Sequence, residues 1–446
     1  MTPSTAATHL TLAQLARGGR TTVETAPYWW DAAPPDESRV APPKTADVLV
    51  VGAGFTGLAA ALVLARGGRQ IVVVDAGAPG FGASTRNGGQ VGSGNQKFRV
   101  RTLIEMKGER KAAELLREGV EMLDGIERLI RDEGIDCNFV RCGRFRGAMR
   151  PAHYEAMARD MGDLSRFTGV EAAMVPRGAQ RGEIGSDLFY GGAVLPADAS
   201  LHPGRYHAGL LARVRDAGAL VIGHAAVRDI VASNGRHEVR FDGFSITARD
   251  VLVATNGYTR NVGAFFAQRI VPVVSSQIAT APIPQDRFDA LFPRRRVFGN
   301  SNRVFFYFRP APGENRLILG GRSGHLAPKG SASAYAHLAR DVLRVFPDLG
   351  DVSVSHAWSG LIGYTFDEFP HLGRTADGVH YAMGYCGTGV SRSTHFGTRI
   401  ANRMLGRPEG RSAFDDDFPS HPFHVFARPA VPVVETWKRL QDAADR

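Results

Sequence analysis

A hydrophobic strand that runs directly into a glycine-rich turn constrains the fold of this chain more than any other feature. Val48–Val51 precede Gly52-Ala53-Gly54-Phe55-Thr56-Gly57, and an apolar helix is predicted from Leu58 to Arg66. Gly52 permits the tight turn, Gly54 lets the backbone approach a pyrophosphate, and Gly57 lets the helix pack closely on the strand. Free N–H groups at the helix N-terminus attract phosphate. The segment predicts a Rossmann βαβ unit that binds a dinucleotide.

The second strand of this unit ends in an acidic residue. The apolar segment Gln70–Val74 leads into Asp75, which lies 21 residues after Gly54 (75 − 54). A carboxylate there accepts hydrogen bonds from the adenosine ribose and repels a 2′-phosphate, which disfavours NADP. The unit alone does not separate FAD from NAD. Its place near the start of a long chain favours FAD, and the later glycine segments 320–324 and 387–392 lack the spacing of a second, NAD(P)H-binding fingerprint.

Composition excludes several other classes of protein. The formal charge of +10 invites a nucleic-acid partner, but the arginines are scattered, and the one tight cluster, Arg294-Arg295-Arg296, reads as a solvated turn. The three cysteines, Cys137, Cys142 and Cys386, make no disulfide framework and no zinc motif. We therefore expect no metal, and we expect a cytoplasmic location. No apolar run approaches the roughly 20 residues of a membrane-spanning helix, and no secretory signal is predicted.

The rest of the chain predicts alternating helices and strands. Residues 1–45 are polar and proline-rich and predict an extended arm, which Tyr28-Trp29-Trp30 would pack onto the body. The region after residue 405 is predicted to be partly irregular. Further predicted elements are helices over 107–133, 202–217 and 391–405, strands at 220–222, 237–241, 245–247 and 251–254, and a hairpin formed by 304–308 and 317–319.

Four separated segments together resemble one family. They are the fingerprint with Asp75, the loop 84–90 (Ser-Thr-Arg-Asn-Gly-Gly-Gln), the stretch 251–258 (Val-Leu-Val-Ala-Thr-Asn-Gly-Tyr), and residues 384–391 (Gly-Tyr-Cys-Gly-Thr-Gly-Val-Ser). The chain resembles the FAD-dependent D-amino-acid-oxidase-like superfamily from about residue 28 to residue 405. The 84–90 loop and the segment from Trp358 to Pro370 are most similar to the γ-glutamylputrescine oxidase and glycine/sarcosine oxidase branch.

The resemblance implies an α/β fold of the glutathione-reductase-like, D-amino-acid-oxidase type. A Rossmann-like FAD-binding domain (1–100, 200–260 and 350–446) would join a mixed β-sheet substrate domain (101–199 and 261–349). The implied cofactor contacts are Gly52, Gly54, Phe55, Thr56, Gly57, Asp75 and Ala76 in the fingerprint unit, Arg86, Asn87, Gly88, Gly89 and Gln90 beside the flavin ring, Val227 near adenine, Ala254, Thr255 and Gly257 near the phosphates, and Gly387, Thr388, Gly389, Val390 and Ser391 before the last helix.

The last of these contacts also makes sense without the resemblance. A helix that begins near Ser391 carries a partial positive charge at its N-terminus. Reduced flavin carries negative charge near N1 and the C2 carbonyl, so a helix end placed there stabilises it.

Two departures from relatives refine the expectation. Sarcosine-oxidase-like proteins attach flavin through a cysteine in the segment that resembles residues 360–367, which contains none here, so non-covalent FAD is expected. The same relatives place a carboxylate-binding lysine where Ser391 stands, which makes a small α-amino acid a less favoured substrate. Related γ-glutamylputrescine oxidases carry histidine where Thr388 stands, which leaves the substrate within the amine class undetermined.

The predicted activity is oxidation of the C–N bond of a primary or secondary amine. Hydride transfer to flavin N5 yields an imine that water hydrolyses to an aldehyde or keto product, and oxygen reoxidises the flavin. One alternative is a FAD-dependent amino-acid dehydrogenase that passes electrons to a quinone, and another is a basic FAD-containing RNA-binding or RNA-modifying protein. No catalytic base is identified. The candidates for an aromatic substrate wall are Tyr258, Tyr307, Trp358 and Tyr364.

Overall fold

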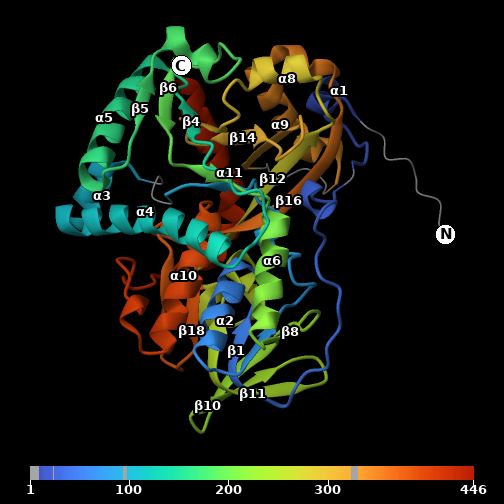
Figure 1. The fold of residues 1–446 in the computed structure, drawn as a ribbon, viewed down its shortest axis with the longest axis vertical. Coiled ribbons are helices and arrows are strands. Elements are labelled where there is room, and N and C mark those ends of the chain that lie inside the picture. Colours follow the sequence, from blue (N-terminus) through green and yellow to red (C-terminus); the bar gives the residue numbers. More distant parts are fainter. Residues whose placement is uncertain (1–9, 24, 94–97, 323–329, 446) are drawn as a thin grey trace, which may run out of the picture.

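The computed structural model describes residues 10–23, 25–93, 98–322 and 330–445 of the chain (Figure 1). Some residues of the predicted segments lie outside this description. They are 1–9 and 24 of the predicted arm, 94–95 after the 84–90 loop, and 323–324 of the glycine segment 320–324. Two large sheets dominate the described part, and helices cover them (Figure 1). The mixed α/β class predicted from the sequence is therefore confirmed.

The first sheet has the predicted βαβ unit at its centre. Strand β1 pairs in parallel with β2 on one side and with β11 on the other, and helix α2 follows β1 directly. β11 is one continuous strand where two separate segments were predicted. The order is β17-β18-β11-β1-β2-β8, with β9 and β10 attached to β11. The strands are β1 (Thr45–Val51), β2 (Ile71–Val74), β8 (Leu220–Ile222), β9 (Asp229–Ser233), β10 (Arg236–Arg240), β11 (Ser245–Val253), β17 (His371–Arg374) and β18 (His380–Met383).

Both faces of β1 are buried, which explains its unbroken run of apolar residues. Val48 and Val50 join a core with helices α2, α4, α6 and α10, whereas Leu49 and Val51 join a second core on the opposite face. Helix α10 lies so close to α2 that a Cβ added at Gly397 would stand 2.3 Å from the Thr56 carbonyl oxygen. The helices are α2 (Phe55–Arg66), α4 (Glu109–Asp132), α6 (Pro203–Asp216) and α10 (Gly389–Met404).

The second sheet contains the predicted hairpin, now formed by β14 and β15. Its order is β16-β12-β15-β14-β13-β4-β6-β5. The domain boundaries stay a prediction, and β16 joins this sheet although it falls in the range predicted for the FAD-binding domain. The strands are β4 (Arg144–Gly147), β5 (Ala173–Val175), β6 (Gly192–Leu195), β12 (Val271–Thr280), β13 (Val297–Asn300), β14 (Phe306–Pro310), β15 (Leu317–Arg322) and β16 (Val354–Tyr364).

Smaller elements complete the described fold. Two short strands, β3 and β7, form a separate antiparallel pair beside the site. The helices that remain cover the second sheet and its edges, except for α7, which follows β11. These elements are β3 (Gln90–Val91), β7 (Ala199–Ser200), α1 (Leu12–Arg17), α3 (Val100–Lys107), α5 (Pro151–Thr168), α7 (Ala264–Ala267), α8 (Gln285–Leu291), α9 (Ala332–Val345) and α11 (His424–Ala444).

The two ends of the chain differ from each other in how well the sequence predicts them. The aromatic patch of the arm packs onto the body as expected: Trp29 is fully buried and its Nε1 donates to the Asn87 carbonyl oxygen at 2.8 Å. The C-terminal region, predicted as partly irregular, instead forms the long helix α11, which contains Pro429 and Pro432. Those two prolines argued against a helix in the sequence, but α11 accommodates both.

Candidate cofactor and substrate site

One cavity of about 1030 Å³ joins the two sheets and brings the predicted segments together. It lies at the upper end of the range of roughly 300–1,000 Å³ for small-molecule sites, which leaves room for a dinucleotide and a small substrate. The predicted residues that line it are Gly52, Gly54, Phe55, Thr56, Asp75, Ala76, Asn87, Gly88, Gln90, Val227, Ala254, Thr255, Gly387, Thr388, Gly389, Val390 and Ser391. Gly57, Arg86, Gly89 and Gly257 stand behind this lining.

The glycine turn after β1 has the geometry that phosphate binding requires. Gly52 has φ +108°, and a Cβ at Gly57 would lie 1.9 Å from the Gly52 carbonyl oxygen. Helix α2 begins after Gly54, which has no side chain to cap the helix. The N-terminus of α2 therefore opens into the cavity with its partial positive charge, as an anion site does.

Asp75 is held rigidly at the end of β2. Its Oδ2 accepts a hydrogen bond from the Ala53 amide at 2.8 Å, and its Oδ1 accepts one from the Gly77 amide at 3.0 Å. Burial raises the pKa of this carboxyl group, whereas the two amides favour its charged form and lower the pKa. Each carboxylate oxygen keeps a further lone pair, so the group fits a pair of ribose hydroxyls.

The 84–90 loop is shaped by its own asparagine and by the arm. Asn87 Nδ2 donates to the Ser84 carbonyl oxygen at 2.8 Å, and Asn87 Oδ1 accepts from the Gly89 amide at 2.8 Å. Gly88 faces the cavity, where an added Cβ would lie 2.8 Å from Tyr307 Cε2. The Trp30 Nε1 donates to Thr85 Oγ1 at 2.8 Å. The loop thus presents bare backbone to the cavity, as a flat ring system requires.

Arg86 points away from the cavity although it belongs to the same loop. Its guanidinium group stacks over the Trp30 ring, with Cζ 4.5 Å from the ring centroid, and Nη1 donates to the Ser359 carbonyl oxygen at 3.0 Å. The Trp358 Nε1 donates to the Arg86 carbonyl oxygen at 2.9 Å. Arg86 therefore fastens the loop to β16 from behind.

The N-terminus of α10 also faces the cavity. The preceding turn uses Gly387 at φ +95°, and the helix begins at Gly389, two residues before the predicted start. The N-cap residue Thr388 makes no hydrogen bond to the helix amides, because its Oγ1 donates to the Tyr385 carbonyl oxygen. Uncapped N–H groups and the helix dipole are available to negative charge on a bound ring.

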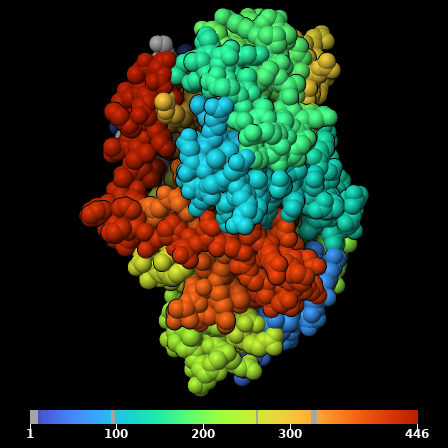
Figure 2. Space-filling view, turned by 90° about the vertical axis from the view of Figure 1, so that its left-hand side faces the viewer, coloured from blue at the N-terminus to red at the C-terminus, as the bar shows by residue number. Residues whose placement is uncertain are grey.

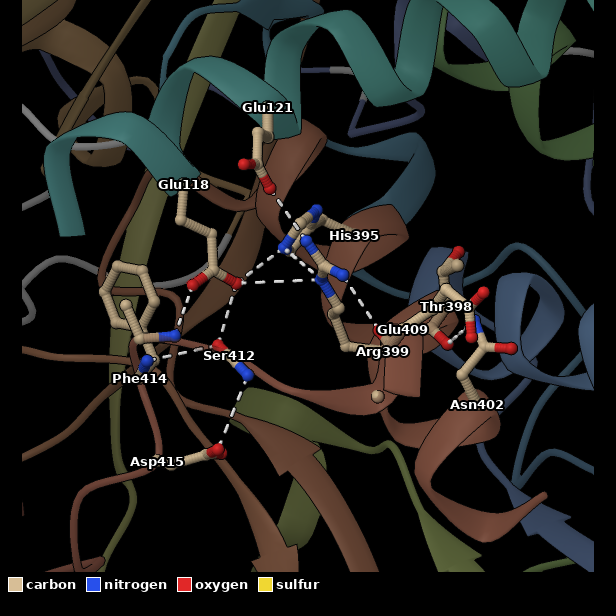
Figure 3. A network of polar contacts seen from close by, with 12 residues as sticks. Glu118, Glu121, His395, Thr398, Arg399, Asn402, Glu409, Ser412, Phe414 and Asp415 are labelled. Atoms are coloured by element: carbon tan, nitrogen blue, oxygen red, sulfur yellow. Dashed lines mark hydrogen bonds and ion pairs between the residues drawn. The ribbon is translucent and has the colours of Figure 1, made fainter. Parts of the chain in front are cut away.

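A buried carboxylate anchors α10 on the side away from the cavity (Figure 3). Glu118 of α4 lies 2.7 Å from His395 Nε2 and accepts a hydrogen bond from Ser412 Oγ at 2.8 Å. Burial raises the pKa of Glu118, but the contacts with His395, Ser412 and the Ala413 amide outweigh it and leave the pKa lowered. His395 follows the turn before α10 closely in the sequence, but its side chain serves this interface and does not line the cavity.

The four aromatic wall candidates separate into two pairs. Tyr258 and Tyr307 line the cavity. Trp358 is fully buried behind it, and the Tyr364 hydroxyl accepts a hydrogen bond from Arg322 Nη2 at 2.6 Å. Arg322 itself lines the cavity, so Tyr364 orients a cation of the site without lining it.

Two arginines of β4 were not predicted for the site. Arg144 lines the cavity but pairs with Asp198, with Nε and Oδ2 2.6 Å apart, and donates to Gln90. Arg146 also lines the cavity, and no hydrogen bond or ion pair joins its guanidinium group to another described residue. Burial lowers the pKa of the Arg146 guanidinium, which stays cationic at neutral pH. The alternation Arg-Phe-Arg, which puts both cations on one strand face, was the signal in the sequence.

Other lining residues come from positions far apart in the chain. Ser84, Tyr385 and Cys386 belong to two segments that carry the family resemblance but were not predicted as contacts. The others carry no motif, so the sequence offered no signal for them; they include Asn300, Asn302, Arg303, Phe305, Arg322, Glu368, Lys438 and Gln441.

In the ranges that the structure describes, no three His, Cys, Asp or Glu side chains come together as metal ligands. Cys137, Cys142 and Cys386 are free thiols. Within those same ranges, no helix is long and apolar enough to cross a membrane.

Known proteins share this architecture and much of this sequence. A probable oxidoreductase OrdL of Haemophilus influenzae is 31% identical over 379 residues, which cover 83% of this chain and 85% of the relative. A gamma-glutamylputrescine oxidoreductase of Escherichia coli is 30% identical over 383 residues, or 85% of this chain and 88% of the relative. The crystal structure of glycine oxidase from Geobacillus kaustophilus superposes with a TM-score of 0.70 at 22% identity, covering 84% of this chain and 97% of that one.

Residues 47–403 match the family described as FAD dependent oxidoreductase, abbreviated DAO. The matched range contains the fingerprint, the 84–90 loop and the turn before α10. The resemblance inferred from those segments is confirmed, and so is its branch, because the relatives include γ-glutamylputrescine and glycine oxidoreductases. The chain belongs to the DAO family of FAD-dependent oxidoreductases.

Proposed function

We propose that this oxidoreductase binds FAD non-covalently in the cavity and oxidises the C–N bond of a primary or secondary amine. The observation that carries the proposal is the continuity of the cavity. Its lining includes Asp75 and the glycine turn, Gly88 and the N-terminus of α10, together with Tyr307 and Arg146. One ligand can therefore span the first three features and leave the last two for a substrate.

FAD, when bound, supplies the hydride acceptor for the carbon next to the amine nitrogen, and water then hydrolyses the imine product to an aldehyde or keto compound. The chain's own residues position the amine, exclude water and stabilise charge. Tyr307, in contact distance of the Gly88 backbone, provides a flat apolar wall that keeps the amine close to the ring. The N-terminus of α10 stabilises the negative charge that the ring gains.

The substrate class follows from the charges at the far end of the cavity. We propose an amine that carries a carboxylate remote from the reacting nitrogen, as a γ-glutamyl derivative of a diamine does. Arg146 would receive the carboxylate, because its guanidinium group makes no hydrogen bond or ion pair with the described residues, and Glu368 adds a negative charge to the cavity wall that suits an ammonium group. The name of the Escherichia coli relative supports the same class.

The proposal is tested on the purified protein with an amine panel. γ-Glutamylputrescine, putrescine, sarcosine and glycine would each be supplied in air, with hydrogen peroxide and aldehyde measured as products. We expect γ-glutamylputrescine to give the highest kcat/KM and sarcosine and glycine the lowest. A higher kcat/KM for glycine than for γ-glutamylputrescine and putrescine would contradict the proposed substrate class. Peroxide formation identifies oxygen as the acceptor, whereas aldehyde that forms without peroxide and only after a quinone is added would identify a quinone.

The non-covalent state of the cofactor has a separate test. Acid precipitation of the yellow protein should leave the flavin in the supernatant, because the segment 360–367 provides no cysteine for attachment. Colour that stays with the precipitated protein would contradict this part, and Cys386, which lines the cavity, would then be the residue to replace.

A further inference from the structure

One wall of the cavity is a row of residues that crosses three strands of the second sheet. Gly299 of β13 pairs with Tyr307 of β14 on one side and with Arg146 of β4 on the other. Residues directly opposite each other in paired strands point to the same face of a sheet, and all three of these residues line the cavity. The next row along the same strands consists of buried phenylalanines that face the core behind the sheet. They are Phe145, Phe298 and Phe308.

The middle residue of the first row leaves a groove between the other two. A Cβ added at Gly299 would meet no atom within 4 Å, and Gly299 does not have a positive φ. The Tyr307 ring lies away from this groove, over Gly320 of β15, where an added Cβ would stand 2.6 Å from the Tyr307 hydroxyl oxygen. The backbone at Gly299 therefore does not require glycine, and the missing side chain serves to keep the groove open.

The two ends of the groove carry different chemistry. Tyr307 lies against Gly88, in the loop that the proposed function places beside the flavin ring. Arg146 carries a positive charge, and its guanidinium group makes no hydrogen bond or ion pair with the described residues. Neighbouring strands lie about 4.8 Å apart, so the backbones of Tyr307 and Arg146 are about 10 Å apart. The groove therefore joins an apolar wall at the reacting end to a cation about 10 Å away.

The groove is enclosed by helices as well as by the sheet. The lining of the same cavity includes Met161 of α5. It also includes Lys438 and Gln441 of α11, the helix that Figure 2 shows in red at the upper left. The row is therefore one wall of a site and not an open sheet surface.

We propose that Gly299 determines the length of the substrate. The groove over Gly299 admits an unbranched chain that connects the oxidised carbon, beside Tyr307, to a carboxylate on Arg146. This inference rests on the function proposed above and adds a length to it. An extended chain advances about 3.5 Å for every three bonds, so a span of about 10 Å corresponds to about nine bonds. The same number of bonds separates the oxidised carbon from the carboxylate carbon in γ-glutamylputrescine.

The first test uses the FAD-loaded wild-type protein and a series of straight-chain amines with a terminal carboxylate. The series is 4-aminobutyrate, 6-aminohexanoate, 8-aminooctanoate, 10-aminodecanoate and 12-aminododecanoate. We expect kcat/KM to reach a maximum at 10-aminodecanoate, which has the span of γ-glutamylputrescine, and to fall again at 12-aminododecanoate. Alkylamines of matching length are the control. They should show no such maximum, because the apolar area that they bury grows with every added carbon.

The second test fills the groove. Gly299→Leu places a side chain in open space, so the variant should fold, and its flavin spectrum and thermal unfolding verify this. The ratio of kcat/KM for 10-aminodecanoate to kcat/KM for butylamine should fall about tenfold or more, mainly through a higher KM for the long amine. Gly162→Leu on α5 is the matched control, because a Cβ there also meets nothing within 4 Å and Gly162 does not line the cavity.

The possible failures of the two proposals are distinguishable. If the protein oxidises the amines but kcat/KM is flat or rises steadily with chain length, the length selection is wrong. It is also wrong if Gly299→Leu keeps the wild-type ratio. A yellow protein that oxidises neither γ-glutamylputrescine nor any amine of the series would instead contradict the proposed function, and the length selection with it.

Discussion

The two ends of the cavity are built from different parts of the protein. The proposed nucleotide end consists of backbone: the glycine turn, the bare loop at Gly88 and the N-termini of α2 and α10. The proposed substrate end consists of side chains, among them Arg146 and Tyr307, which distant strands bring together. Backbone sites serve one ligand shared by a whole family, whereas side-chain sites change with each substrate. A substitution at one end should therefore affect cofactor retention and at the other end substrate selection.

The largest expected effect is at the nucleotide end. Gly54→Glu places a charged side chain where the pyrophosphate would lie, and an added Cβ there already comes within 2.8 Å of Ser84 Oγ. We expect the variant to purify without FAD, as measured by its visible absorbance. Gly162→Glu is the matched control, because a Cβ at this helical glycine meets nothing within 4 Å. If the Gly54 variant stayed fully yellow, the nucleotide end would be misassigned.

The second prediction concerns the substrate end. Arg146→Gln removes a cation that can make charge-assisted hydrogen bonds to a carboxylate, a loss of about 1.5–3 kcal/mol. We expect kcat/KM for γ-glutamylputrescine to fall about tenfold to hundredfold, while the visible flavin spectrum stays unchanged. Putrescine, which has no carboxylate, is the control substrate, and kcat/KM for putrescine should fall little. An equal loss for both amines would mean that Arg146 does not select the carboxylate.

A third prediction tests the support behind the flavin end. Glu118→Gln removes the charge that His395, Ser412 and the Ala413 amide surround, so the free energy of unfolding should fall by about 1–3 kcal/mol at pH 7. The folded pKa of Glu118 lies below its ordinary value of 4.5. The stabilisation is therefore complete above pH 4.5 and is lost as the pH falls through the folded pKa.

Denaturant unfolding at a series of pH values measures this loss. The difference in the free energy of unfolding between the wild type and Glu118→Gln should shrink on acidification below pH 4.5. A difference that stays constant down to the acid transition would show that the charge of Glu118 contributes nothing.

The smallest expected effect is at the anchor between arm and loop. Trp29→Phe keeps an aromatic ring but removes the hydrogen bond from Nε1 to the Asn87 carbonyl oxygen. One neutral hydrogen bond is worth about 1 kcal/mol, so FAD affinity should weaken about fivefold. Fluorescence titration of the apoprotein with FAD measures this change. Unchanged FAD affinity would mean that the 84–90 loop holds its shape without the arm.

The comparison between the two ends also explains what the sequence could predict. Glycines at 52, 54 and 57, and Asp75, have fixed spacing because the backbone geometry of the βαβ unit sets it. The fold class therefore followed from the sequence, and the nucleotide end could be proposed from it. Arg146 and Glu368 line one cavity although they are far apart in the chain. The alternation Arg144-Phe145-Arg146 places Arg146 on a strand face but does not say what that face meets, and Glu368 lies in a loop with no motif. Helix α11 was missed as well, because Pro429 and Pro432 argued against a helix there.

Anaerobic mixing of the purified protein with γ-glutamylputrescine tests the central claim most directly, because it reports the cofactor and the amine reaction in one spectrum. We predict a yellow protein whose visible flavin band bleaches on mixing. The Arg146→Gln variant should bleach only at much higher amine concentration. A colourless protein that cannot take up FAD, or a yellow one that no amine bleaches, would contradict the account.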